Sequence, residues 1–149
     1  MSIPANQRGS IELESEMMPQ EPPPDIVLFG AEWKPRAMIR AQLIEAGFDV
    51  VATNTWPMMR RHLRLGSKPR LAIVDLKGLS NPQDVLNDLR VLMNPKRVLV
   101  LTAIGTVPAA EIERLGFRVL SRPIVIKDVV DTAADAIRSG HSPSASSSP

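Results

Sequence analysis

Five short apolar runs alternate with five amphipathic stretches along the middle of the chain. The runs are rich in Ile, Val, Leu and Phe and cover residues 25–29, 49–53, 70–74, 97–101 and 117–120. Continuous apolar runs of this length are typical of parallel strands, because helices cover both faces of such a sheet. Their alternation with helical patterns predicts five β-α units in a parallel sheet, with right-handed crossovers and helices on both faces.

Prolines and glycines mark where the intervening helices begin and end. Proline suits the first turn of a helix, and glycine suits the position just after the last turn. The expected helix starts carry Pro35, Pro57, Pro82 and Pro108. The expected helix ends carry Gly47, Gly66 and Gly116. The predicted buried stripes are Met38, Ile39 and Leu43; Met59 and Leu63; Val85, Leu89, Leu92 and Met93; and Val129, Ala133 and Ile137.

The two ends of the chain differ in composition from the middle. Residues 1–24 contain five prolines among mixed polar residues, and residues 140–149 form a Ser-rich segment of low complexity. We expect both segments to be disordered tails, with only a marginal helix over residues 10–18. One folded domain is therefore predicted over residues 25–139, a usual size for a single core.

Composition narrows the classes of protein to which the chain can belong. The 149 residues are 44% hydrophobic and 23% charged, which is ordinary for a globular protein. The absence of cysteine excludes disulfides, thiolate chemistry and zinc–cysteine sites. No apolar run is long enough to cross a bilayer, and the first residues lack the pattern of a signal peptide, so we expect a cytoplasmic protein.

Motifs for catalysis and nucleotide binding are absent from the sequence. Neither GxGxxG nor GxxxxGK[ST] occurs, and no serine has His and Asp companions in a recognisable arrangement. His62 and His141 have no Cys or Asp partner at a spacing typical of metal ligands. We therefore expect a binding protein and not an enzyme.

Polar side chains follow the third, fourth and fifth predicted strands, at the edge where open α/β sheets bind their ligands. Asp75, Thr102 and the pair Arg122 and Pro123 hold these positions. With the segments LAIVDL, VLVLTA and SRP, this order resembles the response-regulator receiver domain of bacterial two-component signalling. The resemblance covers nearly all of residues 25–139 and implies a flavodoxin-like fold with strand order 2-1-3-4-5.

The resemblance implies a role for three of these side chains. Asp75 occupies the position of the phosphoacceptor, and Thr102 occupies that of the Ser/Thr that hydrogen-bonds the phosphoryl group. Arg122 stands where the family has a lysine, which keeps the charge but changes reach and fork geometry. Alternatively, Asp75 caps the following loop or pairs with Arg122, and that pair would imitate a fixed signalling state.

The metal-binding part of the family's site is missing. The family holds a divalent cation such as Mg²⁺ with two adjacent acids after the first strand. Gly30 and Ala31 occupy those positions, Glu32 is a weak substitute as a metal ligand, and Val119 stands where the family has an aromatic switch residue. We therefore expect a degenerate, pseudo-receiver-like domain with weak or absent metal-dependent phosphorylation at Asp75 and no certain cofactor.

The expected partners are signalling proteins. The family suggests a histidine kinase, a phosphotransfer protein or another regulator, and a homodimer through the fourth helix, fifth strand and fifth helix. Trp33 and Trp56 follow the first two strands and are candidates for a partner surface, or for a cover over Asp75.

Two other functions stay open from the sequence. One is an anion- or small-molecule-sensing domain that uses the cleft near Gly30, Thr102 and Arg122. The other is a nucleic-acid-binding module, which the small net charge of +2 disfavours. Its basic residues would be Arg36, Arg40, Arg60, Arg61, Arg64, Lys68 and Arg70.

Overall fold

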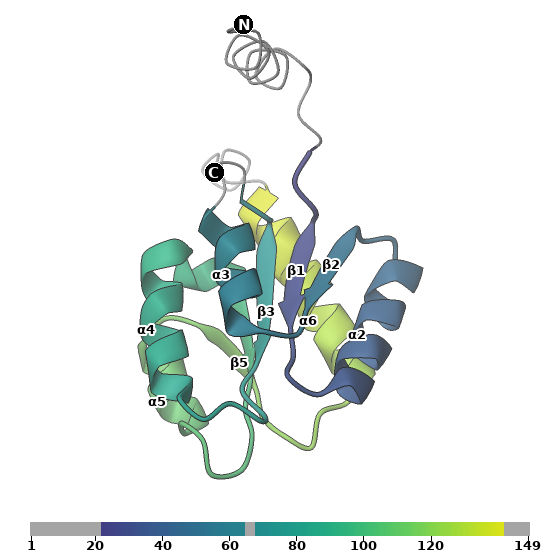
Figure 1. The fold of residues 1–149 in the computed structure, drawn as a ribbon. Helices are drawn as coiled ribbons and strands as arrows, with labels where there is room; N and C mark the ends of the chain where they lie inside the picture. Colours follow the sequence, from purple (N-terminus) through teal and green to yellow (C-terminus); the bar gives the residue numbers. More distant parts are fainter. Residues whose placement is uncertain (1–21, 65–67, 142–149) are drawn as a thin grey trace, which may run out of the picture.

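The computed structural model describes residues 22–64 and 68–141, which form a three-layer α/β domain (Figure 1). Five parallel strands lie in the order β2-β1-β3-β4-β5, which confirms the predicted fold class. The strands are β1 (Ile26–Phe29), β2 (Val50–Thr53), β3 (Leu71–Asp75), β4 (Val98–Leu101) and β5 (Arg118–Leu120). The helix predicted over residues 10–18 lies outside the described residues, as do most residues of both predicted tails, so the domain boundaries stay predictions.

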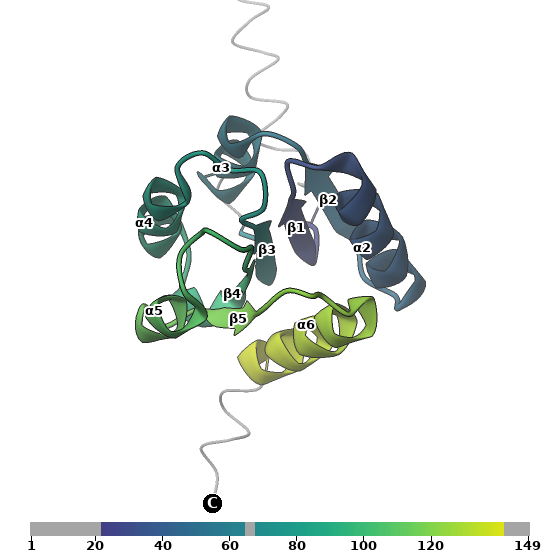
Figure 2. The same cartoon turned by 90° about the horizontal axis from the view of Figure 1, so that it is seen from below.

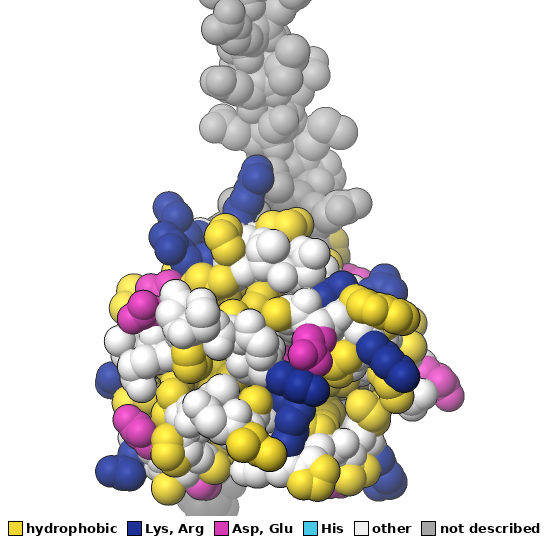
Figure 3. All heavy atoms as spheres, turned by 60° about the horizontal axis from the view of Figure 1, so that its bottom comes forward, with side chains coloured by type: hydrophobic (Ala, Val, Ile, Leu, Met, Phe, Trp, Pro, Cys, Tyr) yellow, Lys and Arg dark blue, Asp and Glu magenta, His cyan; other side chains and the backbone are white. Residues whose placement is uncertain are grey.

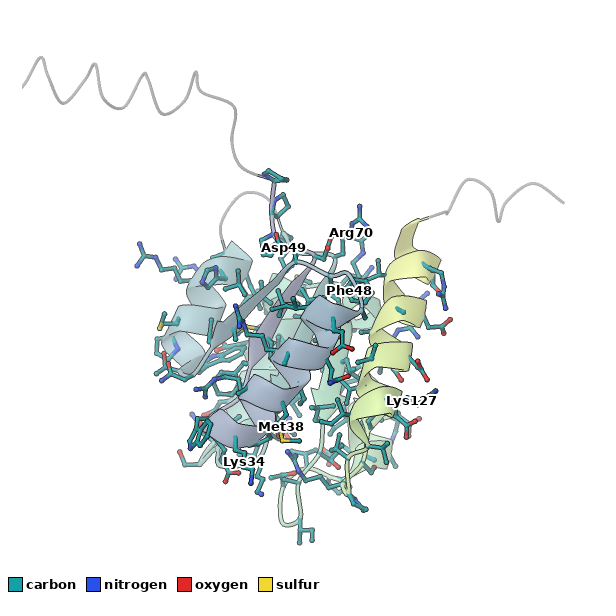
Figure 4. All side chains as sticks on the ribbon, turned by 90° about the vertical axis from the view of Figure 1, so that its right-hand side faces the viewer. Lys34, Met38, Phe48, Asp49, Arg70 and Lys127 are labelled. Carbon is teal, nitrogen blue, oxygen red and sulfur yellow. The ribbon has the colours of Figure 1, made fainter. Side chains whose placement is uncertain are left out.

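Helices cover both faces of the sheet (Figure 2). One face carries α2 (Trp33–Glu45) and α6 (Ile126–His141), which lie side by side in Figure 4. The other face carries α3 (Trp56–Arg64), α4 (Pro82–Leu92) and α5 (Ala109–Arg114). A short 3-10 helix, η1 (Pro95–Arg97), leads into β4. Among the described residues, no helix has the length and apolar character that a membrane span requires.

Each strand begins one residue later than its apolar run predicted, and the first three runs show why. Asp25 accepts a hydrogen bond from the backbone N–H of Asp49 through Oδ2, at 2.9 Å. Its carbonyl oxygen accepts from the backbone N–H groups of Arg70 and Leu71, at 2.9 and 3.1 Å. These bonds tie the chain together at the amino edge of the sheet, where Asp49 and Arg70 are labelled in Figure 4.

The side chains of each strand belong to two separate hydrophobic cores, one on each face of the sheet, because successive side chains point to opposite sides. Most members of the predicted stripes are buried, as expected from their helical spacing. Leu92 is only half-buried, and Met38 is 49% exposed. The prediction for Met38 was wrong because Ile39 and Leu43 define the inward face of α2, and Met38 lies about 100° around the helix from Ile39.

Candidate functional site

The carboxyl ends of three neighbouring strands bring Asp75, Thr102 and Arg122 together. Asp75 is the last residue of β3, Thr102 directly follows β4, and Arg122 comes two residues after β5. Because these strands are adjacent and parallel, their carboxyl ends lie at the same edge of the sheet. Asp75 is 3% exposed and Thr102 is 8% exposed, so both are almost closed off from bulk solvent.

Arg122 binds the carboxylate of Asp75 through a two-pronged ion pair. Its Nη1 donates to Oδ1 and its Nη2 donates to Oδ2, each at 2.7 Å. Nη1 also donates to the carbonyl oxygen of Thr102 at 2.8 Å, which fixes the guanidinium beside β4. The backbone N–H of Lys77 donates to Oδ1 of Asp75 at 2.9 Å. Asp75 therefore caps the loop after β3 and pairs with Arg122 at the same time.

The surroundings of the ion pair keep the guanidinium charged. The hydrogen bond to Asp75 raises the pKa of Arg122, and this effect exceeds the lowering that partial burial causes. The negative charges of Asp75 and Glu32 raise the same pKa further. Charge-assisted bidentate bonds are about twice as strong as neutral ones, so the carboxylate is held in one orientation.

The loop after β1 lacks the side chains that a divalent cation needs. The carbonyl oxygen of Gly30 accepts a hydrogen bond from Arg36 Nη1 at 2.6 Å, and Ala31 has no ligating atom in its side chain. Glu32 instead pairs with Lys77, whose Nζ lies 3.2 Å from Oε1. Among the described residues, no group of three or more His, Cys, Asp or Glu side chains is placed to hold a metal ion. This edge does not fit Mg²⁺, which prefers several oxygen ligands.

The loops after β1 and β3 pack closely against each other. Gly78 has a φ of +84°, in the left-handed region that favours glycine. A Cβ added at Gly78 would lie 3.3 Å from the Cβ of Ala31 and 3.8 Å from the Cγ of Glu32. Figure 3 shows this edge of the sheet, where acidic and basic side chains lie next to each other among hydrophobic and uncharged ones. The close approach of the two loops leaves little room for a larger ligand between Ala31 and Gly78.

The two tryptophans take different positions. Trp33, at the start of α2, is 70% exposed. Trp56, at the start of α3, is half-buried and packs edge-to-face on Phe29, with ring centroids 5.9 Å apart and an interplanar angle of 84°. Its indole N–H donates to Oδ2 of Asp88 at 3.0 Å. Trp56 therefore links α3 to β1 and α4, whereas Trp33 presents its ring to solvent.

We expect Trp56→Phe to lower the free energy of unfolding by about 1 kcal/mol, the usual worth of one hydrogen bond. The smaller ring keeps an aromatic contact with Phe29 but cannot donate to Asp88. Urea denaturation followed by circular dichroism measures the change. Trp33→Phe serves as the control and should have no measurable effect, because that ring is exposed. Equal losses in the two variants would show that the bond to Asp88 contributes nothing.

The basic residues considered for nucleic-acid binding do not gather on one helical face. Two of them belong to α2 and three to α3, and these helices cover opposite faces of the sheet. Arg36 is engaged at Gly30, and Lys68 Nζ donates to the carbonyl oxygen of Leu63 at 2.6 Å. Arg70 lies near Asp25, with a nitrogen–oxygen distance of 3.9 Å. This division weakens the case for a continuous nucleic-acid interface.

Sequence reasoning missed two residues that border the site, Arg36 and Lys77. Lys77 stands two residues after Asp75, but nothing in the sequence identified Glu32 as its partner. Arg36 was named only among the basic residues of the nucleic-acid alternative, and nothing in the sequence placed it against the carbonyl oxygen of Gly30. Both partnerships depend on loop conformation, which the hydrophobic pattern does not encode.

Solved structures share this fold at low sequence identity. The receiver domain of the Francisella response regulator 1452 aligns with a TM-score of 0.67 and 16% identity, over 78% of this chain and 98% of that chain. The signal receiver domain of a putative Luxo repressor protein from Vibrio parahaemolyticus aligns with a TM-score of 0.63 and 23% identity, over 78% and 92%. An adenylate cyclase structure from Rhodopirellula baltica aligns with a TM-score of 0.64 and 20% identity, over 77% and 87%.

These comparisons show that the chain has the receiver fold. At such identities the likeness extends to the fold alone, and the three structures carry different functional descriptions. No family model matches the sequence, and no curated protein matches it significantly. Function must therefore be argued from the residues at the edge of the sheet.

Proposed function

We propose that this chain is an atypical receiver domain of two-component signal transduction that acts through protein–protein contacts, without metal-dependent phosphorylation of Asp75. In this role it is a signalling module and not an enzyme. The observation that carries the proposal is the ion pair in which Arg122 occupies both carboxylate oxygens of Asp75, each at 2.7 Å. The fold shared with solved receiver domains supplies the signalling context.

The chemistry of phosphoryl transfer explains why this ion pair matters. An accepting carboxylate needs a free oxygen in line with the phosphorus, and a cation that neutralises the charge of the phosphoryl group. Oδ1 of Asp75 accepts two hydrogen bonds and Oδ2 accepts one, in a side chain that is 5% exposed. Attack by either oxygen would compete with a charge-assisted bond to Arg122. The ion pair therefore supports a domain that stays in one signalling state and is not switched by phosphorylation of Asp75.

Exposed hydrophobic side chains supply the proposed contact surface. Trp33, Ile104 and Val125 are 70%, 99% and 56% exposed, and they belong to the loops and the helix start that follow β1, β4 and β5. Tryptophan is enriched among residues that dominate binding energy, and Trp33 is the proposed anchor, with the half-buried Trp56 at its border. The proposed partners are a histidine kinase, a phosphotransfer protein or another cytoplasmic regulator, with a second copy of the chain as a further candidate.

Phosphorylation can be tested by intact mass after incubation with a small phosphodonor, with and without Mg²⁺. We expect no added phosphoryl group on the wild-type protein in either condition, because Arg122 blocks Asp75 and no acidic pair holds the cation. Asp75→Ala and the exposed-site control Asp84→Ala should behave in the same way. A Mg²⁺-dependent mass gain that persists in Asp84→Ala and disappears in Asp75→Ala would overturn the proposal.

The alternative functions draw less support from the site. An anion sensor would use Arg36, Lys77 and Arg122, but each of these cations already has a protein partner at 3.2 Å or less. A thermal-shift assay with inorganic phosphate distinguishes this alternative, because a ligand that binds the folded state raises the melting temperature. Nucleic-acid binding would show as salt-dependent retention on heparin.

A further inference from the structure

Helix α3 exposes three arginines on one face. One surface hollow is lined by four residues at the i, i+3, i+4, i+7 spacing of a helical face: Pro57, Arg60, Arg61 and Arg64. Met59 and Leu63 are buried on the opposite side of the helix. We call Arg60, Arg61 and Arg64 the arginine face.

The arginine face is poorly neutralised by the rest of the domain. No acidic residue occurs in α3, and Arg60 lies 3.8 Å from Asp88 in an ion pair whose side chains are 46% and 42% exposed. Within residues 22–64 and 68–141, no ion pair is found for Arg61 or Arg64. Like charges at i, i+4, such as Arg60 and Arg64, repel each other on a helix. An acidic group bound at the arginine face would therefore reduce the repulsion between these like charges.

The start of the chain has the opposite charge. Residues 1–21 contain four glutamates and one arginine, whereas the other 128 residues contain 17 basic and 12 acidic residues. Three of the glutamates, Glu12, Glu14 and Glu16, fall within five consecutive positions. Residues 12–16, which we call the acidic segment, therefore complement the arginine face in both sign and number of charges.

The chain enters the fold at the same end of the sheet as the arginine face. The carbonyl oxygen of Asp25 bonds to the N–H groups of Arg70 and Leu71, and Arg70 comes six residues after Arg64. Figure 1 shows the amino end of β1 and the last turn of α3 at this end. Six peptide steps separate Glu16 from Pro22, a reach of roughly 20 Å when extended. The arginine face spans about 6 Å along its helix, so the tether is long enough.

From charge, position and tether length, we propose that the acidic segment docks in cis on the arginine face of α3. Individual exposed ion pairs are weak and are screened by salt, but a short tether keeps the two charged groups at high effective concentration. The docked segment competes with any acidic partner for the same arginines. The contact is thus a salt-sensitive cover over α3, independent of the Asp75 site.

The absence of cysteine allows a direct test, because Ser10→Cys gives a single attachment point for a nitroxide spin label. Paramagnetic broadening of the backbone amide signals then reports which surface the segment contacts. At low salt we expect strong broadening of the α3 amides, and recovery of their intensity in about 0.5 M NaCl, where the Debye length is only a few ångströms. The double reversal Arg61→Glu/Arg64→Glu should remove the broadening at low salt.

Matched variants make the outcome decisive. Arg40→Glu/Arg114→Glu makes the same charge change at exposed positions of α2 and α5 and should leave the α3 broadening unchanged. Adding Glu12→Arg, Glu14→Arg and Glu16→Arg to the α3 reversal should restore it. The same spectra show whether each variant is folded. Broadening that ignores salt and the α3 reversal, that falls on another surface, or that grows with protein concentration as expected for a second copy, would overturn docking in cis.

Discussion

Arg122→Met is expected to lower the free energy of unfolding by about 3 kcal/mol, because it leaves a buried carboxylate without its counter-ion. The side chain of Asp75 is 5% exposed, and only the backbone N–H of Lys77 would remain as its donor. Methionine fills a similar length of side chain, so loss of packing contributes little. Urea denaturation at neutral pH, followed by tryptophan fluorescence, measures the difference.

Arg138→Met provides the matched control. Arg138 pairs with Asp135 at 3.6 Å, but the two side chains are 74% and 65% exposed. Removing such a surface pair should change the free energy of unfolding by less than about 0.5 kcal/mol. Comparable losses in the two variants would mean that the Asp75–Arg122 pair is solvated like any surface contact.

A second variant separates the cost of an unpaired charge from the worth of the ion pair. Asp75→Val combined with Arg122→Met removes both charges and leaves two apolar side chains at the carboxyl edge of the sheet. Replacing a buried ion pair by apolar groups is often close to neutral, whereas removing one partner is costly. The double variant should therefore be more stable than Arg122→Met alone. A double variant less stable than the single one would refute the unpaired-charge explanation.

The sheet could be predicted from the sequence because its central strands obey one simple rule. Helices on both sides of the sheet bury every residue of β1, β3 and β4. The first four residues of each of these strands are therefore apolar. The edge strand β5 is half-buried and has three residues, yet its apolar run still placed it correctly. Each strand begins one residue later than predicted and β3 also ends one residue later; at the first three starts, bonds between chain segments, not burial, set the boundary.

The residues of the site were only partly predictable. Parallel strands necessarily bring Asp75 and Thr102 to one edge, and the position of Arg122 after β5 made a pair with Asp75 one of two alternatives. The contact of Trp56 with Asp88 spans 32 positions and that of Glu32 with Lys77 spans 45. Such pairings depend on how two loops or two helices meet. Neither hydrophobic period nor local motif carries that information.

Positively charged side chains of the protein bind the oxygen atoms that a metal ion at this edge would otherwise bind. Arg122 holds Asp75, Lys77 pairs with Glu32, and Arg36 donates to the carbonyl oxygen of Gly30. Under the proposed function, the absence of acidic side chains at residues 30 and 31 and the presence of an arginine at residue 122 act together. If this coupling is correct, restoring one part of the site without the other should have little effect, and restoring both should recover cation binding.

The double substitution Ala31→Asp/Arg122→Lys is accordingly expected to raise the affinity for Mg²⁺ by about tenfold or more over the wild-type protein. The Cβ of Ala31 lies close to Gly78, in the loop that begins after Asp75, so a carboxylate at residue 31 would stand at the same edge of the sheet. Lysine is a single point charge and cannot hold both oxygens of Asp75 as the guanidinium fork does. Isothermal titration with MgCl₂ measures the binding, and intact mass with a phosphodonor measures any transfer.

Ala110→Asp/Arg122→Lys is the control, since it adds the same charge at an exposed position of α5. This variant and each single substitution should bind Mg²⁺ no better than the wild-type protein. Tight binding by Arg122→Lys alone would show that the arginine is the only obstacle and that the missing acids are unimportant. No binding by the double variant, with folding intact by circular dichroism, would show that Arg36 and Lys77 also exclude the cation from this edge.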